Sequence, residues 1–132
     1  MNRKKAYKTL LKARMFSLDR VGIAGQTPET VEAFRFLLAD PLGPQSFKQL
    51  LEEGSLPGQV YALAGIYLTD PPSFHEAAAR FEDNAQMLET AFGGCVISCS
   101  SVRDLVRMIS DGEIAENLRT AWGAQLPSRP MR

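Results

Sequence analysis

The chain has few of the residues on which metal and redox sites depend. Its 132 residues include two cysteines and one histidine. Cys95 and Cys99 form a C-x3-C pair, and His75 stands alone. Because structural zinc needs four ligands, usually in two pairs, we expect neither a metal nor another cofactor. We expect both cysteines to be small buried side chains, as free cysteines most often are.

Catalytic motifs are also missing from the sequence. It contains no G-x-x-x-x-G-K-[ST] phosphate loop, no G-x-G-x-x-G and no G-x-S-x-G nucleophile turn. We therefore expect a protein that is not an enzyme. The alternative is an enzymatic or small-molecule site between helices, which would have to use His75, Cys95 or Cys99.

Long apolar runs are absent as well. No stretch of 18 apolar residues occurs, so the sequence predicts no transmembrane helix. The basic start of the chain resembles the first part of a secretion signal, but Lys8, Lys12 and Arg14 interrupt the apolar stretch that should follow. The sequence therefore predicts a cytoplasmic protein.

Charge is balanced overall but unevenly distributed. Residues 1–20 have seven basic side chains and one acid, whereas residues 21–93 have three basic side chains and ten acids. Such asymmetry can attract a charged partner, or the first helix can lie against the acidic middle of its own chain. Nucleic-acid or membrane-surface attachment is a further alternative, although a pI of about 6.6 does not favour it. The candidate basic surface consists of Arg3, Lys4, Lys5, Lys8, Lys12 and Arg14.

Apolar spacing predicts a mainly helical domain over residues 1–132. A basic amphipathic helix is expected within residues 1–20, over 3–18, with Tyr7, Leu11, Met15 and Leu18 on its apolar face. Further helices are expected at about 28–39, 44–53, 57–69 and 71–81, and two more within 101–122, the last marked by Ile114, Leu118 and Trp122. One irregular or short β segment is expected near 92–100, where β-preferring residues follow two glycines. Within residues 82–100, whose conformation the sequence does not fix, the segment "NAQMLETAF" at 84–92 fits either helix or strand, and 123–132 form a tail. The expected architecture is a compact bundle, or a short array, of six or seven helices.

Two similar segments, "LLADPLGPQSF" at 37–47 and "YLTDPPSF" at 67–74, indicate an internal repeat. Each contains an Asp-Pro step, and the two steps are thirty residues apart. Proline can begin the next helix without losing a hydrogen bond, and the aspartate before it can cap that helix. Residues 27–81 would then form two helix–turn–helix units. With its small residues and regular apolar spacing, "PGQVYALAGIYL" resembles a helix of a HEAT-like repeat, a resemblance that implies an α-solenoid arrangement.

These features together favour a non-catalytic protein that binds another protein. Solenoid-like surfaces bind proteins along a concave face. Small cytoplasmic immunity proteins that neutralise a cognate toxin are one narrower version, by analogy of size and fold. The acidic middle would attract a partner with a basic surface, and the candidate positions are Glu29, Glu32, Glu52, Glu53 and Glu76.

Overall fold

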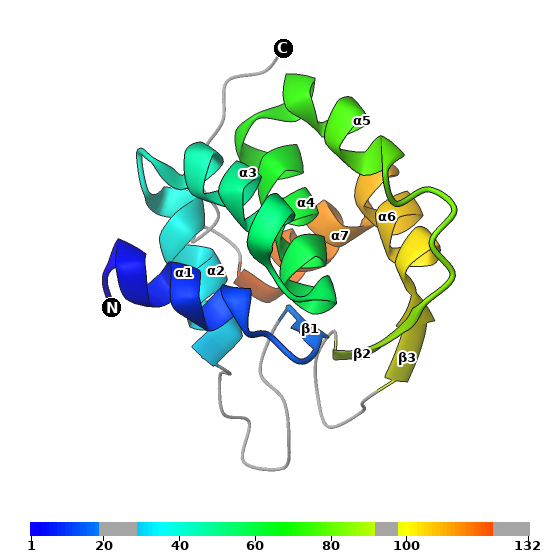
Figure 1. Cartoon of the computed structure of the whole chain (residues 1–132), viewed down its shortest axis with the longest axis horizontal. Helices are drawn as coiled ribbons and strands as arrows, with labels where there is room; N and C mark the ends of the chain where they lie inside the picture. Colours follow the sequence, from blue (N-terminus) through cyan, green and yellow to red (C-terminus); the bar gives the residue numbers. More distant parts are fainter. Residues whose placement is uncertain (19–28, 92–97, 123–132) are drawn as a thin grey trace.

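The computed structural model describes residues 1–18, 29–91 and 98–122, and of the last three of these only the backbone. It is mainly helical with a small sheet, which confirms the predicted fold class (Figure 1). The elements are α1 (Arg3–Leu11), β1 (Phe16–Ser17), α2 (Glu29–Ala39), α3 (Gly43–Glu53), α4 (Leu56–Thr69), α5 (Pro71–Ala79), β2 (Met87–Ala91), β3 (Ser98–Ser101), α6 (Val102–Ser110) and α7 (Glu113–Trp122). Cys95, the side chain of Trp122 and the predicted tail lie outside the described residues.

Helix α4 occupies the centre of the molecule (Figure 1). It contacts α1, α2, α3, α5, α6, α7 and β1. Every residue from Val60 to Ile66 is buried, as expected for a helix that is apolar on all sides. The other helices therefore surround α4, as in a compact bundle.

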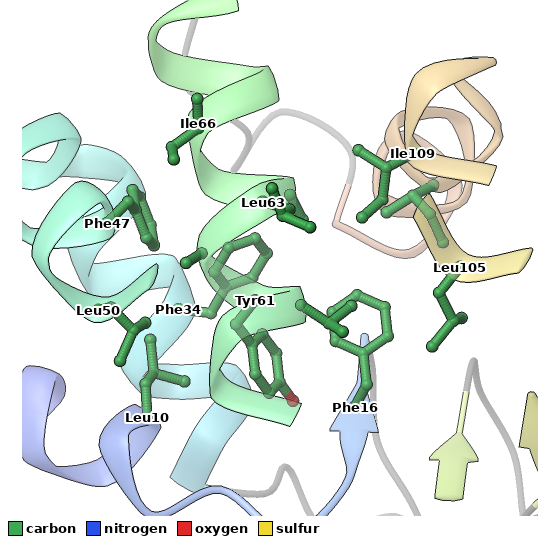
Figure 2. Close-up of a cluster of buried hydrophobic side chains, with 14 of the residues drawn as sticks. Leu10, Phe16, Phe34, Phe47, Leu50, Tyr61, Leu63, Ile66, Leu105 and Ile109 are labelled. Atoms are coloured by element: carbon green, nitrogen blue, oxygen red, sulfur yellow. The ribbon is translucent and has the colours of Figure 1, made fainter. Parts of the chain in front are cut away.

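Aromatic rings fill the space between α4 and its neighbours. The ring of Tyr61 lies 4.8 Å from that of Phe16 and 5.3 Å from that of Phe34, measured between centroids. Leu105 and Ile109 of α6 complete the cluster from the opposite side (Figure 2). Each fully buried side chain of this size contributes roughly 1.5–3 kcal/mol through removal of apolar surface from water.

The first helix is shorter than predicted. The sequence predicted a helix over 3–18, but α1 ends at Leu11, and Phe16 and Ser17 form β1. This strand pairs in parallel with β2, with Phe16 opposite Thr90 and Ser17 opposite Ala91. The pairing also places the Phe16 ring in the core. Burial and strand pairing outweigh the weak helical preference of these residues.

Helix α1 also buries a different face from the one predicted. Ala6 and Leu10 are fully buried, whereas Tyr7 and Leu11 are only partly buried. Because these two pairs are offset by one residue, the helix is rotated about its axis by roughly one residue, or 100°.

The predicted β segment near 92–100 corresponds to β3, which begins at Ser98. It pairs antiparallel with β2, from Met87 opposite Ser101 to Thr90 opposite Ser98. The sheet order is β1-β2-β3, with β2 in the middle. Residues 87–91, which fitted either helix or strand, are therefore extended. Ser101 is the N-cap of α6, and its hydroxyl accepts a hydrogen bond from the Asp104 N–H at 3.2 Å.

The two predicted helix–turn–helix units are α2–α3 and α4–α5, and their boundaries lie within about two residues of those expected. The aspartate of each turn pairs with a cation from the helix that precedes its unit: Asp40 with Arg3 of α1, and Asp70 with Lys48 of α3. The side chain of Asp70 does not cap α5, contrary to expectation. The Asp70 carboxylate accepts a hydrogen bond from the Ser73 hydroxyl at 2.8 Å, in addition to its ion pair with Lys48. The HEAT-like resemblance stays a prediction.

None of the helices in the described parts of the chain has the length and apolar character needed to cross a bilayer.

Candidate functional site

A cleft of about 550 Å³ lies between α3 and α5, with α4 beneath it. Its apolar lining is one residue of each helix, Leu51, Ile66 and Ala77, and of these only Ala77 is more than marginally exposed. Its rim bears four exposed charged side chains. These are Lys48, Glu52, Glu76 and Arg80.

Two ion pairs connect α3 to the α4–α5 unit beside this cleft. The Arg80 guanidinium donates to both oxygens of Glu52, at 2.8 and 3.2 Å. The Lys48 ammonium lies 2.7 Å from a carboxylate oxygen of Asp70. The hydrogen bonds from Arg80, together with its positive charge, lower the pKa of Glu52 below its ordinary value. Because both pairs are partly exposed to solvent, each contributes little stability, and their main effect is to fix the positions of the rim side chains.

Glu76 differs from the other charges of the rim. It is exposed on α5 and makes no hydrogen bond or ion pair with the described residues. A carboxylate beside an apolar surface can receive a lysine or arginine, whose long apolar stem packs while its charged end stays hydrated. The cleft can therefore accept a basic side chain at Glu76.

The structure brings only two of the five predicted acidic positions, Glu52 and Glu76, to this cleft. Glu53 lies at the α1–α3 contact, where it accepts hydrogen bonds from the Tyr7 hydroxyl and from the Gln49 amide at 3.3 Å. The pKa of the Tyr7 hydroxyl is raised, mainly by its partial burial and secondly by its hydrogen bond to Glu53. Glu29 faces the lysines of α1, and Glu32 is exposed on α2.

The residues of the predicted basic surface also lie in different places. Arg3 donates two hydrogen bonds to the Asp40 carboxylate, so this residue does lie against the chain's own acidic middle. Four lysines, in contrast, line a second hollow on α1 together with Glu29. These are Lys4, Lys5, Lys8 and Lys12. Arg14 is exposed and does not line that hollow.

The candidate nucleophile and base are not brought together in the described residues. His75 is exposed on α5 and lines a groove with Arg103 of α6. Cys99 is also exposed, which contradicts the prediction that it is buried. It lies in β3, at the edge of the sheet, and β3 buries only Ser101. In the part of the chain that the structure describes, no three His, Cys, Asp or Glu residues lie close enough together to hold a metal.

Sequence reasoning missed Lys48, Asp70 and Arg80 as parts of the candidate site. A signal was present, since only three cations stand among the ten acids of residues 21–93. Each of those cations was therefore a candidate for an internal ion pair. The sequence could not show which acid each one meets, because the partners are 22 and 28 residues away and are joined only by the packing of α3 against α4 and α5.

No protein-family model matches this chain, and neither a curated protein nor a solved structure is significantly similar to it.

Proposed function

We propose that the protein is a non-catalytic interaction module that binds another protein, and that the α3–α5 cleft receives a lysine or arginine of that partner. The observation that supports this most directly is the position of Glu76, a carboxylate with no ion-pair partner among the described residues, in a cleft lined by Leu51, Ile66 and Ala77. The exposed Glu52 beside it adds a second negative charge, although Arg80 partly neutralises that charge.

The character of the cleft favours a side chain of a protein over a free small molecule. Small-molecule sites are usually enclosed and mostly apolar, with a few polar groups. Here four charged, exposed side chains form the rim. A partner that inserts one basic side chain would cover the half-buried Ala77 and leave the charges at the edge of the interface, which is the usual arrangement of a protein–protein contact.

The cleft accounts for only part of the affinity of such a complex. An exposed ion pair is worth about 0.2–1 kcal/mol. A specific interface buries about 800 Å² on each partner, so the partner must also contact the surfaces of α3 and α5 around the cleft. Glu76 would then set the orientation of the partner and the rate of association more than the total binding energy.

The test is to purify the tagged protein from its native cells at moderate salt and to identify any protein bound in stoichiometric amount. The affinity of that protein is then measured for the wild type, for Glu76→Arg and for Glu32→Arg. Glu32 is a matched control, since it is also an exposed glutamate on a helix, and it does not line the cleft. We expect Glu76→Arg to weaken binding about tenfold, through loss of one charge contact and addition of a repulsive one, and Glu32→Arg to change it much less.

Two results would contradict the proposal. One is the absence of any stoichiometric protein partner, and the other is equal affinity of the wild type and Glu76→Arg. A partner that is found can also be expressed alone in the same cells, and toxicity in that experiment would support the narrower role of an immunity-type protein.

A further inference from the structure

The lysine hollow on α1 carries an unusual excess of one charge. It has a volume of about 530 Å³ and is lined by Lys4, Lys5, Lys8 and Lys12, with Glu29 of α2 as its carboxylate. All four lysines are exposed, and none forms an ion pair or hydrogen bond through its ammonium group with a described residue. Three positive charges therefore remain unbalanced within the hollow.

This arrangement is unfavourable for the isolated protein. Lys4 and Lys8 are four residues apart within α1, and like charges at that spacing destabilise a helix by about 0.2–0.5 kcal/mol per pair, while Lys12 adds a third positive charge at the end of the helix. Carboxylates that could have relieved the repulsion are engaged elsewhere, Asp40 by Arg3 and Glu53 by Tyr7. A bound anion would remove the repulsion and add attractive contacts.

The geometry does not favour insertion into a membrane. An amphipathic helix binds a bilayer through an exposed apolar face, whereas Ala6 and Leu10 of α1 are fully buried in the core. The exposed side chains of this helix are the charged ones, and its apolar Tyr7 and Leu11 are partly buried.

The geometry also favours a short anion over a nucleic acid. Tyr7, the aromatic residue of α1, is hydrogen-bonded to Glu53 rather than free to stack on a base. The lysines extend from residue 4 to residue 12, or about 12 Å at roughly 1.5 Å per residue. Glu29 of α2 also lines this short patch, so a chain of phosphates along it would meet a carboxylate.

We propose that the lysine hollow binds a short acidic segment of a protein, with aspartate or glutamate side chains reaching the ammonium groups of α1. This site shares no residue with the α3–α5 cleft. The two proposals can therefore fail separately.

The test measures binding of the full chain to a fluorescent decaglutamate peptide at 50 mM salt and at higher salt. A ten-nucleotide oligothymidine and phosphatidylserine vesicles serve as competing anionic probes. We expect the peptide to bind at least as tightly as the oligonucleotide, with an affinity that falls as salt rises. Tenfold tighter binding of the oligonucleotide or of the vesicles would overturn the proposal, as would no detectable binding of the peptide at 50 mM salt.

A pair of matched variants locates the site. Lys5→Glu and Arg103→Glu make the same change in net charge, each at an exposed position in the first turn of a nine-residue helix, where an acid interacts well with the helix dipole. We expect Lys5→Glu to weaken peptide binding about tenfold and Arg103→Glu to leave it within about twofold. Equal effects of the two variants would show that only net charge matters, and would overturn the assignment to this hollow.

A third variant tests the same site through a gain of binding. Glu29→Gln removes the carboxylate that faces the lysines, so the peptide should bind about two- to fivefold more tightly. Unchanged or weaker binding would place the peptide outside the hollow.

Discussion

The side chain of Tyr61 hydrogen-bonds to both backbone groups of Ser17. Its hydroxyl accepts from the Ser17 N–H and donates to the Ser17 carbonyl, both at 2.8 Å, and it lies 3.1 Å from the Thr30 hydroxyl. β1 pairs with β2 along one edge, so the hydroxyl satisfies backbone groups that a further strand would otherwise bond. Figure 2 shows the hydroxyl directed toward β1. One side chain of the central helix thus holds the end of the sheet in place.

Tyr61→Phe should destabilise the fold strongly for so small a change. It keeps the ring but leaves a buried N–H and a buried carbonyl of Ser17 without this partner, and each unsatisfied group costs about 1–3 kcal/mol. We expect the free energy of unfolding, measured by urea denaturation, to fall by about 2–4 kcal/mol.

Tyr67→Phe is the control for this variant. Tyr67 lies on the same helix, packs its ring against Phe74, and makes no hydrogen bond through its hydroxyl to a described residue. Loss of the Tyr67 hydroxyl should lower the free energy of unfolding by less than about 0.5 kcal/mol. Similar costs for the two variants would contradict the role assigned to the Tyr61 hydroxyl.

Gly65→Ala should also be destabilising, although glycine is normally the poorer residue in a helix. An alanine there would gain about 1 kcal/mol from helix propensity alone. However, its Cβ would lie 2.5 Å from carbons of the Phe47 ring, where α3 packs against α4. We expect a net loss of about 1–3 kcal/mol in the free energy of unfolding.

The double variant Gly65→Ala/Phe47→Leu tests the cause of that loss. The smaller leucine leaves room for the new methyl group, so the double variant should be more stable than the sum of the two single effects implies. Strict additivity would mean that the Phe47 ring is not what excludes a side chain at position 65.

Local signals predicted most of the helices, and non-local contacts explain what they missed. The helix at 57–69 was expected from its regular apolar spacing, and in the structure Ser55 begins α4 by accepting a hydrogen bond from the Gly58 N–H. In contrast, β1 is a two-residue strand whose partner Thr90 lies 74 residues from Phe16. Nothing near Phe16 specifies that pairing. An expectation based on periodicity alone therefore extended the helix through it.

The same distinction applies to the candidate sites. The sequence showed where acidic and basic residues are enriched, but the fold determines which of them are neutralised. Glu52 and Glu53 are adjacent, yet Glu52 pairs with Arg80 at the end of α5, and Glu53 accepts a hydrogen bond from Tyr7 of α1. Glu76 and the lysines of α1 became candidates only because they lie at the edge of a hollow without an ion-pair partner among the described residues.

The pair between Arg3 and Asp40 should make stability depend on pH in the acid range. The guanidinium of Arg3 donates to both oxygens of Asp40, one of them at 2.9 Å, and these hydrogen bonds lower the pKa of the carboxyl from its ordinary value of 3.8. A depressed pKa in the folded state means that protonation favours the unfolded chain. The contribution of the pair is thus fully present above pH 3.8 and is lost as the pH falls through the lower, folded value.

Asp40→Asn removes the stabilising contribution of the Arg3–Asp40 pair at every pH, so comparison with the wild type shows the pH range in which the pair acts. We expect the variant to be less stable than the wild type in urea denaturation at pH 7. The difference should shrink as the pH is lowered below 3.8, because the wild-type carboxyl is then protonated as well. Asp83→Asn is the matched control, since Asp83 is exposed and makes no ion pair with a described residue. The contrary result is a difference in the free energy of unfolding between wild type and Asp40→Asn that stays constant from pH 7 into the acid range. It would show that the charge of the pair with Arg3 contributes nothing, and that the asparagine acts only by altering the turn between α2 and α3.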